Sequence, residues 1–183
     1  MKIKAILLSV ALGATLLVGC GANDEAKEPA KTEATTPAVA DVVTTASLVD
    51  TEAAFEKGIS SEGTWIISTL KDLTFDKDIV VEGELKNTKD PAVLQRKIAL
   101  YTQDEDRKVT ARFTLTAPKL TFSSPAGSIE HGIFKGDLYV TANDFQLKDA
   151  KVEGNVYFTT DEAKSTFKMD DKSSVTGVQE LKK

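Results

Sequence analysis

From Gly63 onward, the chain repeats a short pattern of apolar and polar positions. Two apolar residues flank a polar one, a polar corner follows, and an apolar residue then stands two positions before a glycine. The spacing from the first apolar residue to the glycine is nearly constant in three copies, at 73–83, 145–154 and 167–177, and is longer in a fourth, at 120–136. Alternation of this kind is typical of β-strands with one buried face, so this part of the chain is predicted to be all-β.

Two of these copies share a longer phrase. Gly-Asp-Leu-Tyr-Val at 136–140 returns as Gly-Asn-Val-Tyr-Phe at 154–158. Repeats of roughly 18 to 23 residues that bury little apolar surface alone, but can stack on one another, indicate a β-solenoid. In such a fold Tyr139 and Tyr157 would occupy matching positions in successive coils. The alternative is a β-sandwich or barrel, because antiparallel sandwiches also show short alternating strands with frequent turns.

A short amphipathic helix is expected over residues 47–59. Ser47 and Asp50 have the spacing of a capping box, and Gly58 is a candidate left-handed C-cap. One face of the helix would carry Leu48, Glu52, Phe55 and Ile59. Because a helix this short needs a surface to lie on, we expect it to cover one open end of the β-structure.

Residues 97–115 depart from the repeat. The runs 97–102 and 109–115 are rich in strand-forming residues, and they flank the charged run Gln-Asp-Glu-Asp-Arg-Lys at 103–108. This arrangement predicts a β-hairpin with a charged tip, as an insertion packed along the coils.

The segment 1–19 has the pattern of an export signal peptide. Residues 1–4 carry two lysines, and residues 5–18 form an apolar run that is too short to span a bilayer as a stable helix. The chain then reads Leu-Val-Gly-Cys at 17–20, which resembles the lipobox of bacterial lipoproteins. The resemblance implies that Cys20 becomes the mature N-terminus and carries a covalent diacylglyceryl lipid.

The residues that follow predict a tether and then a single domain. Residues 20–46 are rich in Ala, Thr, Glu and Pro and contain no aromatic residue, so they are expected to be disordered. Residues 47–183 have the length of one domain with its own core. Two acyl chains on Cys20 would hold this domain durably on the outer side of the cell membrane, as expected for a Gram-positive lipoprotein.

The charge and the cysteine content argue against nucleic-acid binding and against a disulfide within the chain. The chain has 28 acidic and 23 basic residues, a formal charge of −5, and loss of residues 1–19 would remove two lysines and bring it to −7. An acidic protein gains no counterion-release energy from nucleic acid, so nucleic-acid binding is not expected. Cys20 is the only cysteine, which rules out a disulfide within the chain.

The region 120–178 carries two phrases of a known type, Phe-Lys-Gly-Asp-Leu-Tyr-Val at 134–140 and Val-Glu-Gly-Asn-Val-Tyr-Phe at 152–158. These phrases resemble those of the polymer-forming cytoskeletal, or bactofilin-like, proteins. The resemblance implies a compact right-handed parallel β-helix over residues 47–183. It also implies that coil ends of this kind can stack on one another.

Catalytic and metal chemistry are not expected. His131 is the only histidine, and beside Glu130 it lacks the nucleophile and oriented partner that a catalytic set needs. A zinc site would require three or four ligands, and the acidic run at 104–106 lacks the spacing of a calcium loop. We therefore predict a protein that is not an enzyme and has no cofactor other than the lipid on Cys20.

The function expected from these features is a membrane-anchored structural or interaction scaffold that associates with itself. The alternative is a glycan- or cell-wall-binding lipoprotein. In either case the repeated coils would present an interaction face formed by Asp137, Tyr139, Asn155 and Tyr157. Tyrosine rings can stack on sugars, whereas tyrosines at matching positions also stiffen a sheet as ladder partners.

Overall fold

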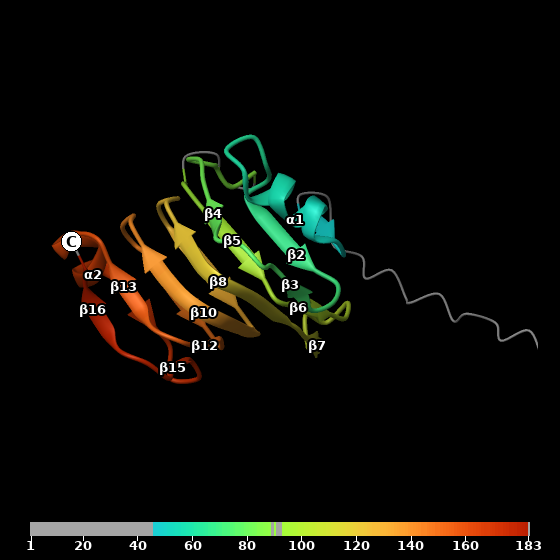
Figure 1. Cartoon of the computed structure of the whole chain (residues 1–183). Coiled ribbons are helices and arrows are strands. Elements are labelled where there is room, and N and C mark those ends of the chain that lie inside the picture. The colour runs from blue at the N-terminus through green and yellow to red at the C-terminus, as the bar shows by residue number, and fades with distance from the viewer. Residues whose placement is uncertain (1–45, 89, 91–92, 183) are drawn as a thin grey trace, which may run out of the picture. The chain divides into compact units, whose positions relative to one another are not determined.

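The structure is a computed structural model that describes residues 46–88, 90 and 93–182 (Figure 1). The predicted signal peptide, Cys20 and nearly all of the predicted tether lie outside the described residues. The described part is mostly β-structure, as predicted, and its strands form two large parallel sheets and one small hairpin.

Strands from successive parts of the chain lie next to one another in each large sheet (Figure 1). The six-stranded sheet has the order β1 (Ala46–Val49), β2 (Ile66–Thr69), β5 (Arg96–Ala99), β9 (Gly127–Glu130), β11 (Gln146–Lys148) and β14 (Lys168–Met169). The eight-stranded sheet contains β3 (Leu73–Thr74), β4 (Ile79–Val81), β8 (Thr114–Phe122), β10 (Ile133–Val140), β12 (Lys151–Glu153), β13 (Val156–Phe158), β15 (Ser174–Val175) and β16 (Gln179–Leu181).

The chain alternates between the two sheets as it advances. It passes from β9 to β10, from β11 to β12 and β13, and from β14 to β15 and β16. Each strand pairs in parallel with its counterpart from the pass before. An antiparallel sandwich would pair neighbouring strands in opposite directions. Among the described strands only β6 (Tyr101–Gln103) and β7 (Val109–Arg112) do so.

The recurring phrase has a direct structural cause. Tyr139 in β10 pairs with Tyr157 in β13, so the two copies of the phrase lie side by side in register. Three of the predicted glycines also stack. Gly177 donates its N–H to the Gly154 carbonyl at 2.9 Å, and a Cβ on Gly154 would overlap the Gly136 carbonyl.

The repeat predicts that all four copies begin in the same sheet, which is wrong for two of them. The copies at 73–83 and 120–136 begin in the eight-stranded sheet, whereas the other two begin at the six-stranded sheet. Leu73 pairs with Leu115, which pairs with Phe134, so Leu73 belongs to the eight-stranded sheet. Similarly, Leu120 pairs with Leu138, which also lies in the eight-stranded sheet. The reason is physical: strands of both sheets alternate with the same two-residue period, so the pattern alone does not tell one sheet from the other.

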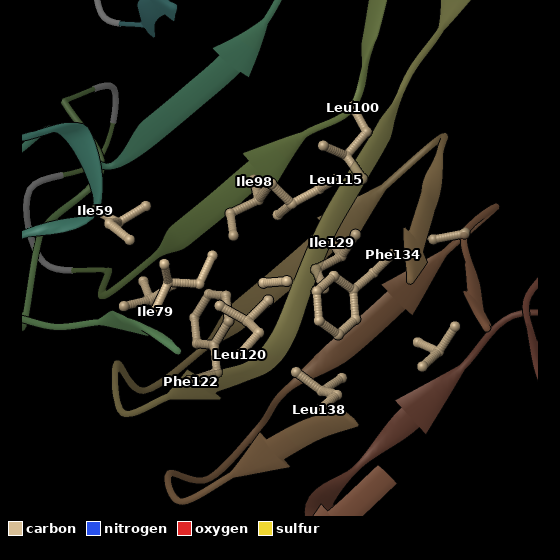
Figure 2. Close-up of a cluster of buried hydrophobic side chains, with 14 of the residues drawn as sticks. Ile59, Ile79, Ile98, Leu100, Leu115, Leu120, Phe122, Ile129, Phe134 and Leu138 are labelled. Carbon is tan, nitrogen blue, oxygen red and sulfur yellow. The ribbon is translucent and has the colours of Figure 1, made fainter. Parts of the chain in front are cut away.

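The core lies between the inward faces of the two sheets, and Figure 2 shows its central part. Aligned rows of apolar side chains run from strand to strand through the core. Both Leu115 and Phe134 are fully buried, as are Ile98 and Ile129 from the six-stranded sheet. Full burial of each such side chain contributes roughly 1.5–3 kcal/mol to folding. These rows are the principal source of stability in the stack.

The predicted helix over residues 47–59 begins too early. Residues 46–49 form β1, with Val49 buried, and the helix α1 spans Glu52–Ile59. Its N-cap is Thr51, whose hydroxyl accepts from the Ala54 N–H at 3.2 Å. Gly58 lies inside the helix, which ends at Ser60 in an extended conformation. The helix does pack on the first strands, where Phe55 is fully buried.

The predicted hairpin at 97–115 is real but shorter. Its strands are β6 (Tyr101–Gln103) and β7 (Val109–Arg112), which pair antiparallel. The residues predicted at its outer ends belong to β5 and β8 of the large sheets. A second helix, α2 (Asp161–Thr166), was not predicted. Thr160 caps it by accepting the Ala163 N–H at 3.0 Å.

Candidate functional site

The four residues predicted as an interaction face do lie together. The rings of Tyr139 and Tyr157 are 4.9 Å apart between centroids and tilted by 46°. The Lys182 ammonium lies 4.3 Å from the Tyr157 centroid and donates to the Tyr139 hydroxyl at 2.9 Å. That hydrogen bond raises the pKa of Lys182. The tyrosine rings are thus already covered by a cation, instead of forming one flat stacking surface.

Asp137 and Asn155 bind the stacked backbone. Asp137 Oδ1 accepts from the backbone N–H and the side-chain amide of Asn155, at 3.2 and 2.9 Å. Asn155 Oδ1 in turn accepts from the Val178 N–H at 3.0 Å. The polar groups of this ladder are therefore engaged in holding three successive passes of the chain together.

A second cluster joins residues that sequence reasoning did not combine. Asp149 Oδ2 lies 3.0 Å from His131 Nδ1 and also accepts from Arg112 Nη2. Arg112 Nη1 donates to the carbonyls of His131 and Asp149, at 3.0 and 3.2 Å. The hydrogen bond from Arg112, with a smaller contribution from His131, lowers the pKa of Asp149. This cluster ties the end of the β6–β7 hairpin to two corners of the stack.

Glu130, the sequence neighbour of His131, belongs to a separate buried cluster. Its carboxylate lies 2.7 Å from the Lys97 ammonium and 3.3 Å from that of Lys148, and it accepts from the Ser128 hydroxyl at 3.1 Å. Burial alone would raise the pKa of Glu130. The charge and hydrogen bond of Lys97, with Lys148 and Ser128, outweigh burial and lower it.

The lowered pKa predicts an acid-sensitive contribution to stability. Because the folded pKa of Glu130 lies below the ordinary value of 4.5, the ionised carboxylate stabilises the fold fully above that value. This contribution disappears as the pH falls through the lowered folded pKa. We expect Glu130→Gln to remove about 1–2 kcal/mol of the stability difference between pH 7 and pH 3. Urea unfolding at both pH values measures the difference.

The matched control for this prediction is Glu105→Gln. Glu105 is exposed at the tip of the hairpin. Its substitution should leave the pH dependence of the urea midpoint unchanged. An unchanged pH dependence in Glu130→Gln as well would show that Glu130 does not supply the acid-sensitive contribution.

The last pass through the sheets is open on its outer side. In the described part of the chain, no strand pairs with the outer edges of β14, β15 and β16. Met169 is 36% exposed, whereas its partner in β11, Leu147, is 1% exposed. Leu181 is half-buried, whereas its partner Phe158 is buried. This end of the apolar core is therefore exposed to solvent, and we call it the open end.

No group of three or more His, Cys, Asp or Glu side chains is placed to hold a metal ion in the described ranges. In the acidic run at the hairpin tip, Asp104 accepts the backbone N–H of Lys108 at 2.8 Å. The helices that the structure describes are too short or too polar to cross a membrane.

No protein-family model matches this chain, and comparisons with curated proteins and with solved structures gave no match. The fold class defined by the structure is a mostly β protein with parallel sheets.

Proposed function

We propose that this chain is a lipid-anchored cell-surface scaffold whose domain is a short right-handed β-solenoid that associates with itself. The alternation of the chain between two parallel sheets supports the solenoid. The apolar run and the Leu-Val-Gly-Cys stretch support export and lipidation at Cys20. A cell-wall glycan is the alternative partner.

The observation that most directly supports the proposed self-association is the open end. Lys168 and Asp170 donate their backbone N–H groups to the carbonyls of Phe145 and Leu147, at 3.0 and 3.2 Å. Since alternate residues of a strand point their backbone groups to opposite sides, those of Met169 point away from the stack. An unpaired strand edge beside exposed apolar side chains is a template for another strand.

A second copy of this chain is complementary to the open end. A twofold axis through the middle of β14 would place two copies of β14 antiparallel, with Met169 opposite the second copy's Met169. Lys168 would then lie opposite the second copy's Asp170, which pairs opposite charges. The same axis would place β15 beside the second copy's β16, so both sheets would continue across the interface. A twofold contact of this kind is closed, because the same surface of both copies is used, so it produces a dimer and not a filament.

We expect Met169→Lys to weaken dimerisation by more than about tenfold, because two unpaired ammonium groups would be buried at the centre of the interface. Sedimentation velocity of the full chain in detergent over a range of concentrations measures this change. The control is Val80→Lys, since Val80 is 40% exposed but lies in β4, far from the open end in sheet order. A wild-type chain that is monomeric at every concentration contradicts self-association, and equal weakening by both variants contradicts the proposed interface.

The anchor has a separate test. We expect Cys20→Ser to move the protein from the membrane fraction to the medium, because the variant has no thiol to which a lipid can be attached. Fractionation of cells followed by immunoblotting measures the distribution. The control is Ser47→Ala, which leaves the Leu-Val-Gly-Cys stretch intact and should remain in the membrane fraction. Retention of Cys20→Ser in the membrane would mean that the chain is held by something other than this cysteine.

A further inference from the structure

A groove lies on the outer surface of the eight-stranded sheet, at the corner next to the hairpin. It has a volume of about 310 Å³. A row of paired positions crosses it, from Thr114 in β8 through Ile133 in β10 and Lys151 in β12 to Ser174 in β15. This is the outward row of the sheet, because the following residue in each strand points into the core.

The lining of the groove combines residues with little or no side chain and residues with long side chains. Gly132 and Ala150 form part of the floor and contribute little or no side chain. Arg112 and Phe113, at the end of the hairpin, form one wall. Lys172, in the exposed turn before β15, forms the opposite wall. The volume is at the lower end of the range typical of small-ligand sites, about 300–1,000 Å³.

The charged groups of the lining favour an anion. Arg112, Lys151 and Lys172 supply three cations, and Asp149 supplies the single carboxylate. The Asp149 carboxylate is already bound by Arg112 and His131. The nearby Asp170 carboxylate accepts from the Asp149 N–H and from a serine hydroxyl, at 2.9 and 2.6 Å. An excess of cations in one groove is unexpected on a chain whose formal charge is −5.

The rest of the lining is suited to a sugar ring. Phe113 and Ile133 offer apolar surface against which the C–H face of a pyranose can pack. The hydroxyls of Thr114 and Ser174 lie at opposite ends of the row and can exchange hydrogen bonds with sugar hydroxyls. Arg112 already donates to Asp149 and to two backbone carbonyls. It therefore offers a sugar carboxylate its positive charge, and the ammonium group of Lys172 supplies the hydrogen-bond donors.

We propose that this groove binds an acidic sugar residue of a cell-envelope polysaccharide, with the sugar carboxylate between Arg112 and Lys172. Lys151 lies on the floor between them, where it also pairs with Glu153 at 2.8 Å. The groove is separate from the tyrosine pair, but its Lys172 and Ser174 end borders the open end, because Ser174 lies in β15. One copy of the chain supplies every lining residue, so sugar binding does not require self-association.

Isothermal titration calorimetry of the full chain in detergent tests the proposal, with oligogalacturonate as the probe. We expect binding that weakens as salt is raised, because cation contacts with the carboxylate are screened. Lys172→Gln should weaken the affinity about fivefold, and the double variant Lys151→Gln with Lys172→Gln about twentyfold or more. Both lysines lie outside the core, so the urea midpoint should stay close to that of the wild type.

Three comparisons make the result decisive. The control Lys164→Gln, on the exposed side of α2, should bind oligogalacturonate as the wild type does. A neutral oligogalactose of the same length should bind at least about tenfold more weakly, and inorganic phosphate should compete only weakly. Equal binding of the neutral sugar, equal binding of phosphate, an unaffected double variant, or no binding of oligogalacturonate at millimolar concentration would each overturn the proposal.

Discussion

Gly136→Ala is expected to lower the free energy of unfolding by about 3–5 kcal/mol, which is one of the two largest effects that the structure predicts. Gly136 adopts φ +136°, a conformation that residues with a side chain rarely adopt. A Cβ at this position would also overlap the carbonyl oxygen of Ala117 in the neighbouring strand β8. The register between β8 and β10 shifts at this same point. The substitution therefore adds backbone strain and forces two stacked strands apart.

Equilibrium unfolding of the full chain in urea measures this effect. The matched control is Gly58→Ala, which adds the same methyl group inside α1. The new Cβ would lie 3.2 Å from the Ile67 side chain, a tight contact, while the helix gains about 1 kcal/mol from the better propensity of alanine. We expect a net change of about 1 kcal/mol or less in the control. Equal effects of the two substitutions would refute the view that stacked backbones require glycine at position 136.

The parts of the fold that the sequence did predict depend on local patterns. The alternation of apolar and polar residues identified β-structure, and identical spacing placed Tyr139 opposite Tyr157. Gly136, Gly154 and Gly177 also stack, because close approach of backbones leaves room only for glycine. These features are readable from sequence, since each depends on residue type and on a fixed distance along the chain.

Other parts depend on contacts between residues far apart in sequence. Arg112 and Asp149 are 37 residues apart, and only the fold brings the hairpin end to that corner. Nothing in the pattern around Asp149 separates it from other exposed acidic turn residues. The start of α1 was misplaced for a related reason. Ser47 and Thr51 are both acceptable N-caps, and the pairing of β1 with β2 decides between them.

The predicted tyrosine face shows that the sequence can place two side chains together without showing what else contacts them. Sequence reasoning placed Tyr139 and Tyr157 together correctly, but it could not predict that Lys182 would lie over them. Lys182 is far from both tyrosines in the sequence, and it reaches the rings because β16 pairs with β13. Whether an aromatic pair is available to a ligand therefore depends on the last pass of the chain.

Arg96→Met is expected to lower the free energy of unfolding by about 3–5 kcal/mol. Arg96 is fully buried at the start of β5 and donates to three carbonyls, those of Gly58, Ser60 and Thr64, at 2.8 Å each. Two of these carbonyls belong to the end of α1, where a cation also complements the helix dipole. Burial lowers the pKa of Arg96 to about 10, which still leaves the guanidinium charged at neutral pH.

Methionine fills much of the volume of arginine but leaves the Gly58 and Thr64 carbonyls without this donor, at a cost of about 1–3 kcal/mol for each buried group. The Ser60 carbonyl still accepts the Gly63 N–H at 3.0 Å. We expect Arg96→Lys to lose about half as much, because one ammonium can satisfy some of the acceptors but cannot span them as a planar fork. Urea unfolding measures the loss, and amide hydrogen exchange in α1 should accelerate because the helix loses its attachment to β5.

The control for this prediction is Lys77→Met. Lys77 also contacts α1, through an exposed ion pair with Glu56 at 2.7 Å, and exposed pairs contribute about 1 kcal/mol or less. If Arg96→Met cost no more than this control, the desolvation of the guanidinium would cancel its three hydrogen bonds. The attachment of α1 would then depend on its apolar face, chiefly Phe55, and not on the buried cation.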